Sequence, residues 1–132
     1  MSATSPTVSA SQRKAGYFKV KIRESGESNP AYEFSSNWGY IRDEGEFQFI
    51  QVEGDGWDFR FRVSSKASGG ANEVKDSELR GKVTGQGTGG SVSGFYYGEE
   101  YAECSSYLCQ HIKSGGKEWV VEGDFNFGKE PE

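Results

Sequence analysis

Histidine, cysteine and proline are scarce in this chain, whose 132 residues include one histidine, two cysteines and three prolines. A structural zinc site takes four ligands, most of them cysteine or histidine. Cys104, Cys109 and His111 would supply three of these ligands, and no fourth is evident in the sequence. We therefore expect no metal site and no other cofactor.

The shortage of histidine also bears on catalysis. A nucleophile–base dyad would have to use His111 beside a serine or a cysteine, and the sequence contains no nucleophile-elbow pattern. Carboxylates are plentiful, but their spacing does not show whether two of them form a catalytic pair. The sequence names no catalytic residue, leaves enzyme activity undecided and favours a non-enzymatic protein.

The two cysteines, Cys104 and Cys109, are close enough in the chain to form a local disulfide if the segment between them is a hairpin. On a helix the same spacing would point them apart. A disulfide would indicate an oxidising compartment and free thiols the cytosol. The loop-like composition around the pair favours the disulfide.

Long apolar runs are missing as well. No run approaches the roughly 20 residues of a membrane-spanning helix. The N-terminal stretch MSATSPTVSASQRKAG lacks the apolar region of a signal peptide, so we expect a cytoplasmic protein unless the chain is a processed form. With a formal net charge of −5, the chain lacks the basic surface that nucleic acid binding requires.

Glycine and aromatic residues are abundant, with 19 glycines, nine phenylalanines, seven tyrosines and three tryptophans. Many tight turns and many aromatic side chains are typical of twisted β-sheets. We expect an all-β fold, an antiparallel β-sandwich or flattened barrel of about seven to nine strands. Residues 1–15 are predicted to be a flexible tail, 16–128 a single β domain and 129–132 a C-terminal tail.

The clearest structural signal is a hairpin over Glu46–Val63. Apolar and polar residues alternate along both of its strands, and the two are joined by Gly54-Asp55-Gly56. A three-residue loop would pair Phe49 with Phe61 on the inward face, whereas a two-residue loop would place Ile50 there and leave Phe49 opposite Arg62. We predict the three-residue loop.

The first strand, Tyr17–Arg23, and the strand Trp57–Val63 both carry basic residues on their outward faces. Like charges on directly opposite residues destabilise a sheet. We therefore expect these strands not to be neighbours, as in a simple meander. The basic faces are expected to be solvated, with anion binding as the weaker alternative.

The second half of the chain is less regular. Ser91–Tyr97 is predicted to be a strand with Val92 and Tyr96 inward, and Gly81 and Gly94 to mark bulges or close backbone approaches. Gly85–Gly90 has the letters of a dinucleotide-binding loop but no following helix, so we expect a flexible hairpin loop. Over Glu99–Lys113 the spacing leaves a short helix near 100–113 and a β-hairpin both open.

Several aromatic residues fall outside the predicted inward faces and offer rigid contact area to a ligand. Together with nearby polar side chains they form the candidate ligand-binding set of Asn37, Trp38, Tyr40, Arg42, Tyr97, Glu99 and Tyr101. The fold class and these aromatics favour a lectin-like, carbohydrate-binding module. The alternatives are a protein-interaction domain of inhibitor or effector type, and a small β-barrel enzyme or carrier for an apolar ligand. A homodimer built by edge pairing is compatible with each.

Overall fold

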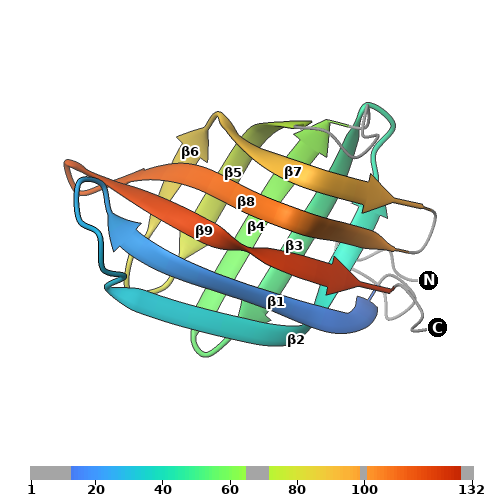
Figure 1. Ribbon diagram of the computed structural model, residues 1–132, viewed down its shortest axis with the longest axis horizontal. Coiled ribbons are helices and arrows are strands. Elements are labelled where there is room, and N and C mark those ends of the chain that lie inside the picture. Colours follow the sequence, from blue (N-terminus) through green and yellow to red (C-terminus); the bar gives the residue numbers. More distant parts are fainter. Residues whose placement is uncertain (1–12, 65–71, 99–100, 129–132) are drawn as a thin grey trace, which may run out of the picture.

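The computed structural model describes residues 13–64, 72–98 and 101–128, and among these residues every regular element is a β-strand (Figure 1). The strands are β1 (Arg13–Glu24), β2 (Tyr32–Asp43), β3 (Phe47–Gly54), β4 (Trp57–Ser64), β5 (Asn72–Arg80), β6 (Gly85–Thr88), β7 (Gly90–Tyr97), β8 (Ala102–Ser114) and β9 (Lys117–Phe127). This confirms the all-β class. Neither of the two alternatives for this segment, the short helix near 100–113 and the β-hairpin, is found, because the single strand β8 occupies Ala102–Ser114.

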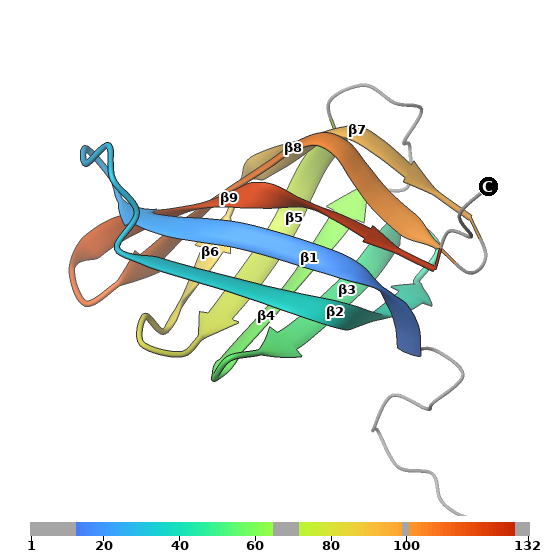
Figure 2. The same cartoon turned by 60° about the horizontal axis from the view of Figure 1, so that its bottom comes forward.

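The antiparallel sheet closes on itself. From β1 it runs through β2, β3 and β4 to β5 in one direction, and through β9 to β8 in the other. Strands β6 and β7 share one position between β5 and β8, with β6 pairing to the end of β5 and β7 to its start. The described residues thus form a closed barrel, so the two-sheet sandwich is not the architecture found. Strands β3 to β5 cross behind the wall made by β1, β2, β8 and β9 (Figures 1 and 2).

The predicted meander is confirmed at the first four strands. The two strands with basic outward faces, β1 and β4, are separated by β2 and β3. Carboxylates lie between and beside them, as in the pairing of Lys21 with Glu33 and of Arg60 with Glu78 across neighbouring strands. Separation of the basic strands avoids the like-charge opposition that would destabilise the sheet.

Aromatic rings fill the interior of the barrel. Phe18 on β1 lies at their centre, with ring centroids of residues from β2, β4 and β9 between 5.6 and 6.4 Å away. These rings belong to Phe34, Phe59, Phe61, Phe125 and Phe127, and each is at most 4% exposed. Such packing argues against the alternative of an interior cavity for an apolar ligand.

The β3–β4 hairpin has the two-residue loop, so the predicted register is wrong. Ile50 lies opposite Phe61, and Phe49 lies opposite Arg62 on the outer face. The turn residues Asp55 and Gly56 have φ angles of 53° and 83°. Positive φ at both central residues is the geometry whose twist matches that of the paired strands, and Asp-Gly favours it.

The expected disulfide is also wrong, since Cys104 and Cys109 are both free thiols on the single strand β8. Five residues of extended chain span about 16 Å, far beyond the Cα separation that a disulfide allows. Cys104 is buried in the core, whereas Cys109 lies on the outer face between the exposed Tyr107 and His111.

Both glycine predictions are confirmed. A Cβ atom at Gly81 would collide with the indole of Trp57, a ring that is 6% exposed. Gly94 has a φ of 65° and lies where the β7–β8 register shifts. This bulge changes the phase of β7, so Phe95 is buried and Tyr96 is exposed, contrary to the predicted inward position of Tyr96.

The remaining boundaries differ in smaller ways. Gly85–Thr88 forms β6 and Gly90 begins β7, where a flexible loop was expected. Residues 13–15, predicted to be tail, belong to β1; the predicted tails at 1–12 and 129–132 lie outside the described residues. No helix in the described part of the chain is long and apolar enough to cross a membrane.

Candidate functional site

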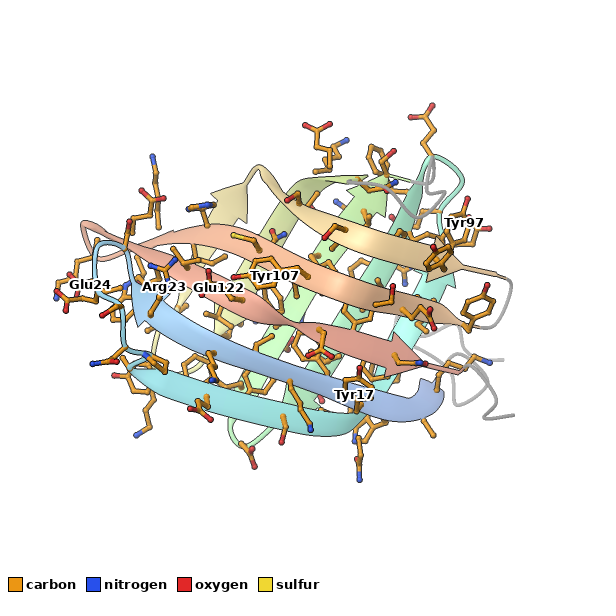
Figure 3. The ribbon with its side chains drawn as sticks, viewed as in Figure 1. Tyr17, Arg23, Glu24, Tyr97, Tyr107 and Glu122 are labelled. Atoms are coloured by element: carbon orange, nitrogen blue, oxygen red, sulfur yellow. The ribbon has the colours of Figure 1, made fainter. Side chains whose placement is uncertain are left out.

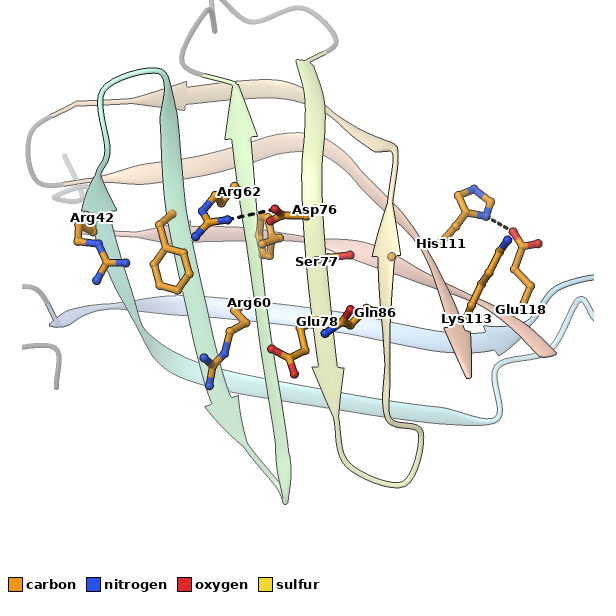
Figure 4. Close-up of a pocket in the computed structure, with 13 residues that line it drawn as sticks. Arg42, Arg60, Arg62, Asp76, Ser77, Glu78, Gln86, His111, Lys113 and Glu118 are labelled. Carbon is orange, nitrogen blue, oxygen red and sulfur yellow. Dashed lines mark hydrogen bonds and ion pairs between the residues drawn. The ribbon is translucent and has the colours of Figure 1, made fainter. Parts of the chain in front are cut away.

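A broad groove of about 970 Å³ lies on the outer face of the barrel, over β3 to β6. Arg42 borders it at one end, and His111, Lys113 and Glu118 border it at the other (Figure 4). Phe49 also lines it. Ligand sites commonly occupy about 300–1,000 Å³, so the groove has room for a small molecule or part of a chain-like one.

Strand alternation places the charged side chains of the groove. On β4 the aromatic residues Phe59 and Phe61 point inward, so Arg60 and Arg62 point outward. Cross-strand pairing then sets Glu78 beside Arg60 and Asp76 beside Arg62. The result is a row in which cations and carboxylates alternate across neighbouring strands.

The aromatic part of the groove comes from the register of the β3–β4 hairpin. Phe49 lies on the outer face, and the guanidinium carbon of Arg42 lies 4.5 Å from its ring centroid. A cation over an aromatic face is attracted by the ring quadrupole, which holds the ring in place on the outer wall. Phe49 was predicted to lie in the core because the three-residue loop was expected. The Asp55-Gly56 dipeptide is the sequence signal that would have predicted its position on the outer face.

Ion pairs link the cations to carboxylates. Glu44 accepts from Arg42 at 2.8 Å and from Arg62 at 3.0 Å, and Arg62 also pairs with Asp76 at 3.1 Å. Burial raises the pKa of Glu44, but the hydrogen bonds and charges of the two arginines outweigh it, so its pKa lies below the ordinary value. The carboxylate therefore stays ionised near neutral pH, and the groove is close to charge balance.

Two residues that line the groove each have a buried polar atom without a hydrogen-bond partner in the described part of the chain, namely Arg60 Nε and Ser77 Oγ. Arg60 uses Nη2 to pair with Asp58 at 3.1 Å, which leaves Nε unused. Ser77 is 4% exposed and pairs with the inward-facing Phe61, so its hydroxyl lies on the inner face of β5. Buried polar groups are nearly always satisfied, so Arg60 Nε indicates where a water or a ligand binds in the groove.

Three of the predicted site residues share one face of strand β2, and one of them reaches the groove. Trp38, Tyr40 and Arg42 alternate on β2, and Arg42 lines the groove itself. The rings of Trp38 and Tyr40 meet edge-on at 5.1 Å and are partly exposed. Asn37 is exposed on the same strand.

The other predicted site residues lie elsewhere. Tyr97 on β7 stacks on Phe95 at 5.7 Å and packs against the core. Its strand is separated from β2 by β1, β9 and β8, about 19 Å around the barrel wall at the usual strand spacing. Tyr101 follows four residues later and is partly buried, and Glu99 lies outside the described residues. The structure therefore does not join the two halves of the predicted set.

A second groove, of about 690 Å³, lies on the outer face of β1, β2, β8 and β9. Within it Glu122 accepts two hydrogen bonds from Arg23, at 3.0 and 3.1 Å, and these contacts lower its pKa. Burial and a hydrogen bond to the same carboxylate raise the pKa of Tyr107. Figure 3 shows the three side chains lying together across three adjacent strands. The hydroxyl of Tyr107 is thus held by Glu122, while the residue remains 45% exposed.

Within the described residues no group of three or more histidine, cysteine, aspartate and glutamate side chains is arranged to hold a metal ion. Comparison of the chain with protein-family models, with curated proteins and with solved structures finds no match.

Proposed function

We propose that this protein is a non-enzymatic, lectin-like module that binds carbohydrate in the groove over β3 to β6. The observation that carries the proposal is the buried, unpartnered Arg60 Nε in a groove whose wall includes the Phe49 ring. A sugar presents hydroxyls that both donate and accept hydrogen bonds, together with apolar C–H faces that pack on aromatic rings.

The charge balance of the groove favours a neutral carbohydrate over an acidic one. Arg42, Arg60 and Arg62 each pair with a carboxylate of the protein. An anionic ligand would have to displace one of these carboxylates, and leaving a partly buried charge without a partner is costly. A neutral polyhydroxylated ligand can use the arginine donors and the carboxylate acceptors together.

A glycan-array screen followed by calorimetric titration of any hit tests the proposal. Arg60→Gln removes the unpartnered Nε donor of the groove, and we expect it to weaken binding by about tenfold or more. Arg23→Gln is the matched control, because it removes the same charge and breaks a similar ion pair of 3.0 Å on the other groove. Equal loss in both variants, or no glycan hit from folded protein, would contradict the proposal.

A protein-interaction role is the second candidate, favoured by the exposed tyrosines. Tyr17, Tyr96 and Tyr107 are 38%, 44% and 45% exposed and lie on β1, β7 and β8. Tyrosine is enriched at the centres of protein interfaces. Under this reading Tyr107→Ala abolishes association with a protein partner, including a second copy of the chain, while Arg60→Gln does not.

A further inference from the structure

A cysteine, a histidine and a glutamate form a hydrogen-bonded chain at the β8–β9 hairpin. Cys109 and His111 are alternate residues of β8, so they share its outer face. The thiol Sγ lies 3.9 Å from His111 Nε2, and His111 Nδ1 lies 2.7 Å from Glu118 Oε2 on β9. The order of the three groups is that of a nucleophile, a base and the carboxylate that orients the base.

The carboxylate fixes how the imidazole can act. A short hydrogen bond from Nδ1–H to Glu118 selects the tautomer whose Nε2 lone pair is directed at the thiol. His111 is then placed to take the proton of Cys109, and the thiolate is the reactive form of cysteine. The sequence did not favour such a dyad, because the chain has one histidine and no nucleophile-elbow pattern.

The surroundings of Cys109 make the base necessary. Burial raises the pKa of the thiol, and the negative charge of Glu122 raises it further, while Arg23 opposes both. From β7, the uncharged Ser91 lies opposite Cys109. The resting group is therefore a neutral thiol, whose reaction at neutral pH depends on proton transfer to His111.

The two cysteines differ in access. Cys109 is partly exposed, whereas Cys104 is fully buried and its Sγ lies 3.4 Å from the backbone oxygen of Ser93. A reagent in solution can reach the first thiol and not the second. Cys104 therefore serves as an internal control, because it should stay unmodified.

The position of Cys109 also restricts the chemistry. Its strand is paired on both sides, to Ser91 of β7 and to Glu122 of β9. The backbone N–H groups here serve the sheet, so they are not grouped as an oxyanion hole, which acyl transfer requires. Thiol–disulfide exchange develops its charge on sulfur and needs no such hole.

We propose that Cys109 is a site of reversible modification by low-molecular-weight disulfides, with His111 as general base and Glu118 as the residue that positions it. The thiol proton moves to Nε2, and the thiolate attacks one sulfur of the disulfide. A new S–S bond forms at Cys109 as the old S–S bond breaks. The departing thiolate takes the proton from His111 and leaves as a thiol, so the disulfide is the sole oxidant.

The test is the rate of adduct formation when the full chain is incubated with oxidised glutathione, followed by intact mass and located by peptide mapping. We expect the adduct at Cys109 and not at Cys104. His111→Gln and Glu118→Gln should each slow the reaction by about tenfold or more. Lys117→Gln is the control, since Lys117 lies in the same hairpin and pairs with Glu24 at 3.6 Å.

The dependence of the rate on pH separates positioning from a structural effect. The wild-type chain should keep a reaction at neutral pH that both variants lose, leaving them a rate that rises about tenfold per pH unit as the thiol ionises unaided. Circular dichroism confirms that each variant is folded. An adduct at Cys104, or an unchanged rate in folded His111→Gln, would overturn the proposal.

Discussion

At the scale of single residues, the outer wall of the barrel is organised by side chains that fix one another. Carboxylates on β9 hold the tyrosine hydroxyls of β1 and β8, so that Tyr17 and Tyr107 present their rings to solvent in set orientations. In the groove over β3 to β6 the arginines are held in the same way by Glu44, Asp58 and Asp76. Preorganised polar groups lose less entropy on binding a ligand.

The bond between Tyr17 and Asp124 makes a prediction about titration. The phenol donates to the carboxylate at 2.7 Å, and this hydrogen bond, with burial and the negative charge, raises the pKa of Tyr17 from 10.0 to about 12. Ultraviolet titration of tyrosinate, with Tyr17→Phe subtracted, should find this pKa lowered toward the ordinary value in Asp124→Asn. An unchanged pKa in that variant would show that the hydrogen bond is not its cause.

The raised pKa of Tyr17 also predicts how the stability of the fold changes with pH. The folded pKa lies above that of the unfolded chain, so the folded state holds the proton more tightly. The stabilisation is complete below about pH 10 and is lost as the pH rises toward about 12. Urea denaturation across this range should show a steeper loss for the wild-type chain than for Tyr17→Phe.

At the scale of elements, the β3–β4 turn decides which face of β3 reaches the groove. Gly56 has a φ of 83°, and a Cβ there would meet no atom within 4 Å, so the cost of a side chain is conformational alone. We expect Gly56→Ala to lower the free energy of unfolding by about 1 kcal/mol. Asp55→Asn should change little, because asparagine tolerates the same positive φ. Equal stability of Gly56→Ala and wild type would argue against the two-residue turn.

The sequence predicted the elements better than their registers. Alternation of Phe59 and Phe61 with Arg60 and Arg62 was enough to identify β4, but its pairing with β3 depends on one residue of loop length. The longer loop places Phe49 on the inward face, so the aromatic part of the groove was not predicted. The Asp55-Gly56 dipeptide was the physical signal for the shorter loop.

Strand β8 shows why periodicity can mislead. Cys104, Leu108 and Ile112 are buried at spacings of four, and such a spacing fits both a helix and an alternating strand. The residue that would have revealed the strand is Gln110, which is also buried but is polar. A register shift between Cys104 and Leu108 interrupts the pairing with β9 as well. The segment is a strand because it pairs with β7 on one side and β9 on the other, and no local sequence pattern encodes these contacts.

At the scale of the whole molecule, the barrel is held together by rings contributed from opposite walls. Phe18 on β1 contacts rings from β2, β4 and β9. We expect Phe18→Ala to lower the free energy of unfolding by about 3–5 kcal/mol, as for other large cavities in packed cores. Phe47→Ala is the control: this ring is partly exposed on the outer face under the Lys75 ammonium, and its loss should cost less than about 1.5 kcal/mol. Similar losses in both variants would contradict the assigned core.

The central claim is that carbohydrate binds in the groove over β3 to β6, and amide chemical-shift mapping tests it most directly. Titration of labelled protein with a glycan found by array screening should move resonances of Phe49, Arg60, Ser77 and Gln86, which line the groove. Arg60→Gln should reduce these shifts at the same glycan concentration, and Arg23→Gln should not. Shifts centred on Tyr107 and Glu122 in the other groove, or none with any glycan tested, would contradict the claim.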